Sequence, residues 1–489
     1  MTTTVLRARA VVCPLAVTLA LSACSDGLVR PPPTGDLSSS DEIKDFAITF
    51  DKVDLTLPPQ SDLSIPCETL RCKQVSCGEG FTTTVTGKVT IPTGQVPLYN
   101  AIVYIPNRPD EVLPFKSGVV CDTCSAVASG KPLVVALTDE NGKFVLENAP
   151  AGDDIPIIIQ LGRWRRQFII PTVTPCDVTV LPDKMLKMPS KKTQGDIPKM
   201  ALATGSADPF ECLLRKIGID DTEFTDGTGN GRVHIYKSNG ADMAVPVQDY
   251  KVLVDDLKKM KGYDVIMLPC EGLPIQRTQQ QLQNLVDYTS AGGRVFGTHY
   301  SYKWFNDPLT PFHLTGEWKP DQGASPDPFH GLIDQTFPKG RAFAKWLKNT
   351  GASTVLGQLD IKEPRHDIDS AYKPPSQRWL YGDDQRNNTA KVMLHMTFNT
   401  PLQFSPPDFA GVSMDGPVPD GGWGPVQCGR VVYSDFHVSA DALGGGGATF
   451  PTRCKIADLS AQEKALTFML FDLSACVTPD EEPPEVPIP

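Results

Sequence analysis

Short apolar runs broken by turn residues fill the chain between residues 82 and 180. β-Branched and apolar side chains dominate these runs, which is typical of β-strands. The tetrapeptide Asp139–Gly142 is a strong turn signal between two of the runs. The pattern predicts an all-β region with strands at Thr84–Val89, Ala101–Ile105, Leu133–Leu137, Lys143–Leu146 and Ile155–Leu161.

Between residues 195 and 477 the pattern changes to strands that alternate with helices. Gln279–Tyr288 places its apolar side chains on one helical face, and the following Gly292-Gly293 ends this helix. Such alternation predicts a largely parallel sheet covered on both faces, with ligands bound beyond the carboxyl ends of the strands. Residues 305–425 look like a long, irregular insertion. The candidate strands are Lys199–Thr204, Tyr263–Leu268, Arg294–Gly297 and Gly429–Asp435.

Two helix starts carry capping signals. Asp208 is expected to cap a helix, with Pro209 at its first position and Glu211 completing a capping box. Ser460 and Glu463 form the same signature before the last helix.

The first 23 residues have the layout of a secretory signal peptide, with Arg7 and Arg9 followed by an apolar run too short to span a membrane. The tetrapeptide Leu21–Cys24 then resembles the lipobox of bacterial lipoproteins, in which the cysteine is acylated. With Ser25 next, the resemblance implies the outer membrane, with Cys24 as the anchor. An ordinary secretory signal with a chance cysteine is the alternative.

The flanks of the chain and its charge limit the possible partners. Residues 24–45 are rich in proline and serine and predict a flexible tether, and residues 478–489 predict a disordered acidic tail. The net charge is −11 without a basic run, which argues against binding nucleic acid. No segment after the signal is apolar for long enough to span a bilayer.

The chain has 13 cysteines, of which Cys13 lies in the signal and Cys24 is the lipid site. Export favours disulfides for the others, which include a cysteine-rich segment at residues 46–81 and the pair Cys121 and Cys124. Zinc bound by two such pairs is the alternative. The odd number that remains predicts at least one thiol that is free or paired between chains.

The all-β region resembles the carboxypeptidase regulatory-like domain, a small transthyretin-like sandwich. The matching residues are Val85–Val89, Thr138–Phe144 and Ala149–Gly152. The resemblance implies a stalk or binding module without catalytic residues of its own. The residues around Cys121 and Cys124 are an insertion relative to the compact form of that family.

The second region resembles the class I glutamine amidotransferase-like superfamily, nearest to its ThuA-like branch. The matching residues are Tyr263–Pro269, Leu285–Gly293 and Arg294–His299. The resemblance implies a flavodoxin-like α/β domain at residues 195–477, so the chain is expected to be multidomain, with a β-sandwich at residues 82–180 before it.

Catalytic residues of the amidotransferases are only partly kept. Thr298 and His299 stand where the nucleophilic cysteine is expected, and Phe436-His437 is kept while Ser439 replaces the glutamate. Cys270 ends the preceding strand, where a structural role or a disulfide is favoured over catalysis.

His299 and His437 are nevertheless expected to meet at one sheet edge, and with Glu271 or Asp435 they could act in catalysis or bind a metal or a polyol. The candidate ligand-binding residues beside them are Thr298, Tyr300 and Trp304. No metal or cofactor is assigned, since His313, His330, His366 and His395 share no ligand spacing.

Three weaker signals have structural alternatives. Asp226–Gly231 resembles the start of a calcium loop, but Lys237 takes the place of the final glutamate, which favours a hairpin turn. Tryptophans in and beside residues 305–425 could stack on sugars or lie buried. Arg163–Arg166 could contact anionic glycans or form a solvated strand edge.

Three functions fit the sequence. The first is a non-catalytic surface lipoprotein that binds a ligand, a carbohydrate or another cell surface. The second is a hydrolase or sugar-modifying enzyme that uses His299 and His437. The third is a structural component of the cell envelope. The missing nucleophile and glutamate favour a binding protein over an enzyme.

Overall fold

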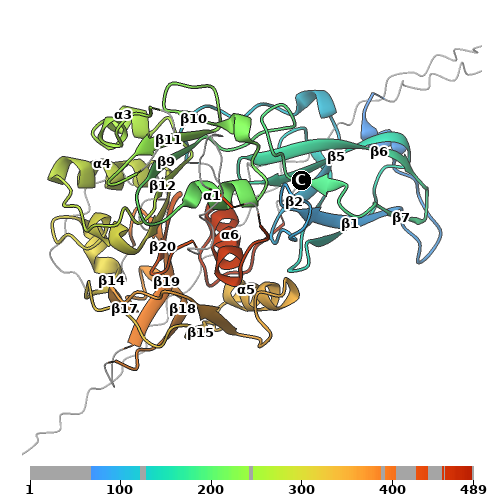
Figure 1. Cartoon of the computed structure of the whole chain (residues 1–489). Coiled ribbons are helices and arrows are strands. Elements are labelled where there is room, and N and C mark those ends of the chain that lie inside the picture. The colour runs from blue at the N-terminus through green and yellow to red at the C-terminus, as the bar shows by residue number, and fades with distance from the viewer. Residues whose placement is uncertain are drawn as a thin grey trace, which may run out of the picture. The chain divides into compact units, whose positions relative to one another are not determined.

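In the computed structural model, the protein is β-rich, with several sheets and few helices (Figure 1). The predicted signal peptide, the tether and Cys24 lie outside the residues that it describes. Among those residues, no helix is both long and apolar enough to cross a membrane. The described residues are 68–121, 128–241, 246–386, 391–403, 426–438, 454–455 and 457–486.

The predicted all-β region forms two four-stranded sheets. Val85 and Val89 of one sheet and Ile155, Ile157 and Ile159 of the other are buried in the same hydrophobic cluster, so the sheets pack through one face each. The first sheet has the order β4 (Lys143–Leu146), β1 (Thr84–Thr90), β7 (Val178–Val180), with β8 (Leu186–Lys187) also paired to β1; the second has the order β3 (Pro132–Leu137), β2 (Ile102–Pro106), β5 (Gly152–Leu161), β6 (Trp164–Val173).

The turn predicted at Asp139–Gly142 is present, but it does not close a hairpin. The Asp139 side chain accepts hydrogen bonds from the backbone of Asn141 and Lys143, both at 2.8 Å. Gly142 has a φ of 73°, which favours glycine at this position. The strands on either side belong to different sheets, because β3 pairs with β2 while β4 pairs with β1. The turn therefore carries the chain from one sheet to the other.

The second region contains a ten-stranded sheet, and its parallel half agrees with the prediction. β12, β13 and β20 run parallel, so their carboxyl ends lie at one edge of the sheet. The parallel half has the order β10 (Phe224–Asp226), β11 (Val233–Lys237), β9 (Met200–Thr204), β12 (Val265–Leu268), β13 (Arg294–Thr298), β20 (Gly429–Ser434).

The predicted irregular insertion instead completes the sheet. Its described residues form four antiparallel strands that extend the sheet beyond β20, and a separate two-stranded sheet. Strands β15 and β16 alternate strictly between buried and exposed positions but are only five and four residues long, and β18 alternates only in part, so the period of two is a weak signal in the sequence. The strands are β19 (Lys391–Thr400), β18 (Ser376–Asp383), β15 (Phe329–Ile333), β16 (Gln358–Ile361), β14 (Gly316–Trp318) and β17 (Ile368–Ala371).

Helices cover both faces of this sheet, as expected. In β9, Met200 and Leu202 join the hydrophobic cluster of α1, α5 and α6, while Ala201 and Ala203 join the cluster of α2, α3 and α4. Alternate residues of a strand point to opposite faces, so each face has its own helices. The helices are α1 (Phe210–Lys216), α2 (Lys251–Val254), α3 (Leu257–Met260), α4 (Gln279–Ser290), α5 (Pro338–Asn349) and α6 (Ala461–Ser474).

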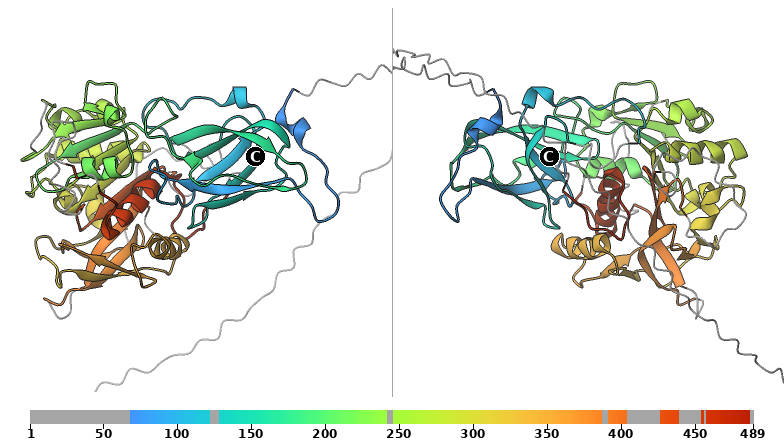
Figure 2. Two further views of the ribbon diagram at one scale, coloured as in Figure 1. Left: turned by 45° about the vertical axis from the view of Figure 1, so that its right-hand side comes forward. Right: turned by 180° about the vertical axis from the view of Figure 1, so that it is seen from behind.

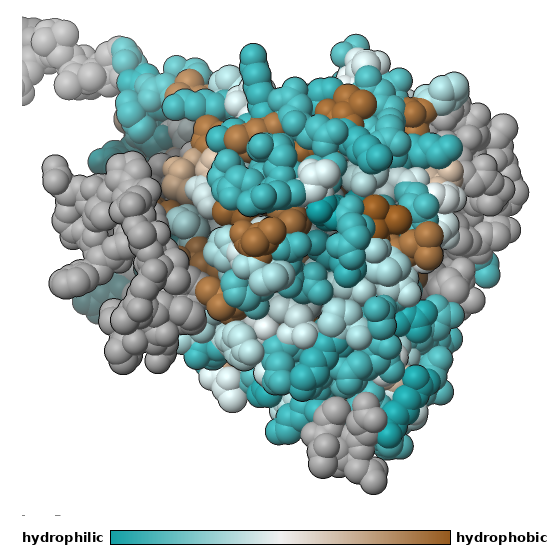
Figure 3. Space-filling model, turned by 90° about the vertical axis from the view of Figure 1, so that its left-hand side faces the viewer, coloured by the Kyte–Doolittle hydropathy of each residue, from teal (hydrophilic) through white to brown (hydrophobic). Residues whose placement is uncertain are grey.

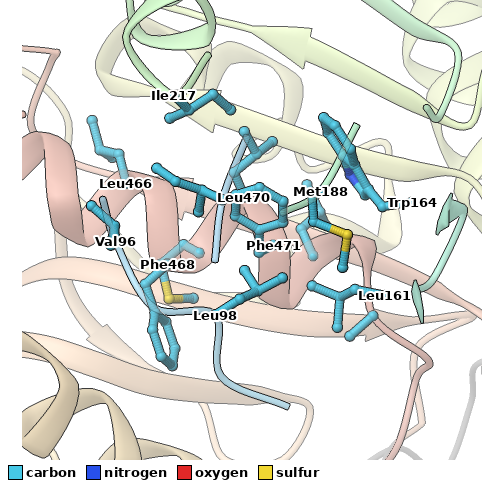
Figure 4. Packing of buried hydrophobic residues seen from close by; sticks show 14 of the residues in the cluster. Val96, Leu98, Leu161, Trp164, Met188, Ile217, Leu466, Phe468, Leu470 and Phe471 are labelled. Carbon is cyan, nitrogen blue, oxygen red and sulfur yellow. The ribbon is translucent and has the colours of Figure 1, made fainter. Parts of the chain in front are cut away.

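Helix α6 packs against both the sandwich strands and the ten-stranded sheet (Figures 1 and 2). Its predicted capping box is confirmed, since Ser460 accepts from the Glu463 N–H and Glu463 reaches back to Ser460 N. Phe471 lies 5.3 Å from Trp164 of β6, ring centre to ring centre. Figure 4 shows Leu466, Phe468, Leu470 and Phe471 among residues of the sandwich region such as Val96, Leu98 and Leu161. One continuous core therefore joins the two regions.

Disulfides are confirmed. The structure contains Cys77–Cys176, Cys121–Cys428 and Cys212–Cys454, and Cys72 and Cys476 are also disulfide-bonded. Cys121 cannot be a zinc ligand, because its sulfur is used by Cys428. Among the described cysteines, Cys270 is free, so the prediction that favoured a disulfide for it is wrong.

Three local predictions are wrong. Asp208 does not cap α1, because its carboxylate accepts hydrogen bonds from Thr298 and Val438 instead. The loop at Asp226–Gly231 is not a hairpin, since β10 and β11 run parallel. The tail is not disordered throughout, because Asp480 is buried against Arg430, with 2.8 Å between Asp480 Oδ1 and Arg430 Nη2.

Candidate functional site

Three side chains follow three neighbouring parallel strands at the carboxyl edge of the sheet. Cys270 lies two residues beyond β12, His299 directly follows β13, and His437 lies three residues beyond β20. His299 opens the 3₁₀ helix η5 (His299–Trp304) with a φ of 39°, a left-handed conformation that is strained for a residue with a side chain. Thr298 and His299 therefore form the corner between a strand and a helix at this edge.

The three side chains meet around the Nδ1 atom of His299. This atom lies 3.1 Å from Nε2 of His437 and 3.3 Å from Sγ of Cys270. All three ligand-type atoms lie within 4.8 Å of one another. The expected convergence of the two histidines is confirmed, and the sequence missed that Cys270 is their partner.

These groups line a cavity of about 400 Å³. Arg365, Asp321 and Tyr300 are among its other lining residues. The Tyr300 ring stacks on His299 with 3.9 Å between ring centres. Small residues complete the wall, such as Gly272. The cavity therefore combines cationic, anionic and aromatic groups around the cysteine and the histidines.

Burial keeps the three central groups uncharged. It raises the pKa of Cys270 to about 12. Burial, with the positive charge of Arg365, lowers the pKa of His437 to about 3. Burial first, and then His437 and Arg365, lower the pKa of His299 to about 2. The thiol thus keeps its proton at neutral pH, and both imidazoles offer a lone pair.

Asp367 supplies the carboxylate nearest to His299, and it was missed by the sequence. Its Oδ2 lies 3.6 Å from Nε2 of His299, and this oxygen is buried without a hydrogen-bond partner in the described structure. Its other oxygen accepts from Asp321 N at 2.7 Å. Asp367 lies at the start of the two-stranded sheet rather than at the end of a parallel strand, so strand-end reasoning could not find it.

Asp435 supports Asp367 instead of facing the cavity. Its Oδ2 accepts from Asp367 N at 2.7 Å, and its Oδ1 lies 3.1 Å from the Tyr433 hydroxyl. Burial, followed by the nearby Asp367, raises the pKa of Asp435 well above its usual value. Asp435 therefore positions the site, and its predicted direct role is corrected to a supporting one.

The Asp208 carboxylate links the segment that precedes His299 to the segment that follows His437 through two hydrogen bonds. Its Oδ2 accepts from the hydroxyl of Thr298 at 2.5 Å, and its Oδ1 accepts from Val438 N at 2.8 Å. The same Thr298 hydroxyl accepts from Cys270 N at 2.9 Å. Burial raises the pKa of Asp208 to about 8. One carboxyl group thus fixes the backbone next to all three central side chains.

Three further predicted site residues do not line the cavity. The Glu271 carboxylate is held by Arg277 and by the Ser238 hydroxyl. Thr298 is fully buried, with its hydroxyl used as described above. Trp304 is buried beneath Arg277, whose guanidinium lies 4.4 Å from its ring centre. Of the predicted ligand-binding residues, only Tyr300 lines the cavity.

His366 also lines the cavity, but both of its ring nitrogens already have partners. Its Nδ1 lies 2.9 Å from Asp384 and its Nε2 lies 2.7 Å from Asp369. The described tryptophans do not offer exposed rings for sugars, since four of them are fully buried and Trp318 is partly buried. Trp423 lies outside the described residues. The fully buried tryptophans are Trp164, Trp304, Trp346 and Trp379.

The Arg163–Arg166 segment is not a solvated edge. Arg163 pairs with Asp264 at 3.2 Å, and Arg165 pairs with Asp196 at 2.8 Å. Both arginines line a second cavity of about 340 Å³ at the opposite edge of the sheet, where these ion pairs already use their charges. On the face shown in Figure 3, the described hydrophobic residues form small patches separated by hydrophilic ones. Neither feature rivals the strand-end cavity as a site.

The chain matches no known family description and no curated protein. Similar solved structures include a ThuA-like protein from Bacteroides uniformis, 12% identical over 56% of this chain and 90% of its own, with a TM-score of 0.29. A cytoplasmic protein from Salmonella typhimurium is 10% identical over 56% and 98%, with a TM-score of 0.27. A cohesin–X-dockerin complex from Acetivibrio cellulolyticus is 16% identical over 31% and 79%, with a TM-score of 0.15. Function must therefore be argued from the site itself.

Proposed function

We propose that this chain is an extracytoplasmic lipoprotein, held on the outer membrane by Cys24, that binds a small polar ligand in the strand-end cavity. The main support is the convergence of His299 and His437 on a cavity of about 400 Å³. Cavities of this size with a few convergent polar groups are typical of small-molecule sites. The carboxyl edge of a parallel sheet is also where such ligands bind in α/β proteins.

Arg365 indicates the chemistry of the ligand. Its backbone N–H donates to Asp435 O at 2.9 Å, which holds the residue at the cavity. Its positive charge reaches both histidines, since it contributes to the lowered pKa of each. A guanidinium recognises carboxylates and phosphates through paired hydrogen bonds. We therefore expect a ligand with an acidic group, such as an acidic sugar.

We further infer the architecture that the resemblances imply. Residues 82–180 would be a transthyretin-like stalk, and residues 195–477 a flavodoxin-like domain of the ThuA-like type. Two packed four-stranded sheets and six adjoining parallel strands support this arrangement. The stalk would hold the cavity away from the membrane surface.

A hydrolase is the second candidate, favoured by one observation. Cys270, His299 and Asp367 follow the order of nucleophile, base and orienting carboxylate, at 3.3 Å and 3.6 Å. His299 would take the thiol proton while sulfur adds to a carbonyl carbon and the C=O π electrons move to oxygen. Collapse of this adduct would expel the leaving group with the proton from His299, and water would then hydrolyse the thioester. Because burial raises the pKa of Cys270 to about 12, this chemistry would be fastest in alkaline solution.

The anchor is tested by cell fractionation of a Cys24→Ala variant. The lipid is the anchor that the lipobox resemblance implies, so the variant should move from the membrane to the soluble extracytoplasmic fraction. Retention of the variant on membranes would refute the lipobox interpretation or reveal a second anchor.

The ligand is tested with the released Cys24→Ala protein. Small carboxylates, sugar acids and sugar phosphates are screened for an increase in thermal stability, and a hit should be lost in Arg365→Met. The control is His330→Ala. His330 is an exposed residue of β15 whose side chain pairs with Asp360. A hit that survives Arg365→Met would place the ligand elsewhere. No hit with any compound would favour a structural role in the envelope.

A further inference from the structure

We propose that Cys270, His299 and His437 bind one thiophilic transition-metal ion, such as Zn²⁺, and leave a fourth coordination position open to the cavity. The proposal deepens the proposed function, and it rests on that function only in placing the metal where the ligand binds. The metal would supply the strongest positive charge in the cavity.

The spacing of the three atoms supports this. Zinc bound by nitrogen at about 2.0–2.1 Å and by sulfur at about 2.3 Å in a tetrahedron separates two nitrogens by about 3.3 Å, and nitrogen from sulfur by about 3.6 Å. The observed separations are 3.1 Å from His299 Nδ1 to His437 Nε2 and 3.3 Å to Cys270 Sγ. These two separations need an outward movement of a few tenths of an ångström to admit the ion, and the donor atoms of the third pair, His437 and Cys270, lie within 4.8 Å of each other.

The scaffold holds the three donors in place without a metal. They follow three adjacent parallel strands. The carbonyl of His437 accepts from Gln462 of α6 at 2.8 Å, and the carbonyl of His299 accepts from the Tyr433 hydroxyl at 3.0 Å. Donors fixed on rigid elements lose little freedom when an ion binds.

The unsatisfied oxygen of Asp367 is the second, independent observation. A metal on Nδ1 of His299 forces the ring proton onto Nε2, which faces Asp367 Oδ2 at 3.6 Å. That buried oxygen has no hydrogen-bond partner in the described structure. Histidine ligands of metals usually donate their other N–H to a carboxylate in this way. Metal binding would thus satisfy a buried polar atom that is otherwise unpaired.

The donor set selects the kind of metal. One thiolate and two imidazoles suit zinc or copper, whereas magnesium and calcium prefer oxygen ligands. Three protein ligands with an open position are typical of catalytic or ligand-binding zinc sites rather than structural ones. Coordination converts the Cys270 S–H into a sulfur–metal bond and releases one proton to solvent for each ion bound.

The test uses the full chain carrying Cys24→Ala, stripped with a chelator and titrated with Zn²⁺ by calorimetry. We expect one ion per chain and, from titrations in buffers of different ionisation enthalpy, about one proton released per ion when the histidines are already neutral. Cobalt as a spectroscopic probe should give a thiolate-to-metal charge-transfer band and the visible bands of a tetrahedral ion.

Variants identify the ligands. Cys270→Ser and His437→Ala should each weaken zinc binding by about 100-fold or more, and Cys270→Ser should abolish the charge-transfer band. Asp367→Asn should weaken binding by about 10-fold and keep the band, because Asp367 positions His299 without touching the ion. His330→Ala is the control and should bind as the parent protein does.

Two results would overturn the metal site. One is the absence of zinc binding to the parent protein, and the other is binding that Cys270→Ser and His437→Ala leave unchanged. The proton count needs no variant, so a variant that fails to fold does not end the test. If zinc does not bind but a ligand hit persists in the chelated protein, the metal site falls and the proposed function stands. If zinc binds but no compound does, the metal site stands and the proposed ligand falls.

Discussion

Buried polar side chains lie at both ends of strand β20, but they are charged and paired at one end and neutral at the other. At its start, Arg430 is buried against Asp472 and Asp480, at 2.9 and 2.8 Å, and Lys339 joins them at 3.2 Å from Asp472. Beyond its other end, His437 meets neutral partners around an open cavity. The first end is a closed set of paired charges, whereas the second is a set of donors with spare capacity.

The pKa shifts show the same difference. Burial alone would raise the pKa of Asp472, but Lys339 and Arg430 hold it below its usual value. At the carboxyl edge, burial raises the pKa of Asp208 to about 8 and that of Glu211 to about 7, because no cation offsets it. Neither group lines the cavity: Asp208 accepts from Thr298 at the end of β13, and Glu211 accepts from Thr204 at the end of β9. Shifted groups without a paired cation at such an edge are more typical of functional sites, and paired ones of structural sites. We therefore assign stability to one end of β20 and function to the other.

Arg430→Met should give the largest effect, because it leaves two carboxylates buried without this partner. We expect the free energy of unfolding to fall by about 3–5 kcal/mol, measured by chemical denaturation. The matched control is Arg108→Met, which breaks a partly exposed pair with Glu111 and should cost about 1 kcal/mol or less. Similar losses in both variants would show that the start of β20 is not a stabilising charge centre.

Glu211 should make the carboxyl edge sensitive to alkaline pH. Burial raises the pKa of Glu211 from its ordinary value of about 4.5 to about 7, so folding favours its protonated form. Its contribution is fully present below about pH 4.5 and is lost as the pH rises through about 7. The expected loss by pH 8 is on the order of 3 kcal/mol.

Glu211→Gln mimics the protonated carboxyl and should flatten this loss in thermal unfolding measured between pH 4 and 8. Glu147→Gln, at an exposed position, is the control and should leave the pH profile as in the parent. The pKa of Asp472 is shifted in the opposite direction, so the contribution of Asp472 to the stability of the protein should be lost as the pH falls. A Glu211→Gln profile that matches the parent would remove this contrast between the two ends.

The sequence predicted the edge of the sheet better than the chemistry at that edge. Strongly patterned elements such as α4 and the three strands around β13 were found, because their apolar residues are local signals. Cys270 and His299 are 29 residues apart and contact each other only through the strand order. Asp367 enters from the segment taken for an irregular insertion, and no local pattern could have placed it beside His299.

The C-terminal tail, residues 478–489, is a second place where a local pattern in the sequence did not predict a tertiary contact. Its composition is that of a disordered segment, yet Asp480 is buried because it forms an ion pair with the buried Arg430. Composition reports the average tendency of a segment and not one specific ion pair. Asp208 was likewise assigned to a local helix cap, and a tertiary contact with Thr298 uses its carboxylate instead.

The smallest effect concerns the backbone of His299. Its φ of 39° strains any residue with a β-carbon, and the strain is tolerated where the ring meets Cys270 and His437. In the metal-free protein, His299→Gly should therefore be more stable than His299→Ala by about 1 kcal/mol, measured by chemical denaturation. His437 has no such positive φ, so His437→Gly should be less stable than His437→Ala by about 0.5–1 kcal/mol. The same sign at both positions would show that His299 is not strained. A fall of several kcal/mol in both alanine variants would instead show that the histidines are packing residues, and the two ends of β20 would then have the same structural role.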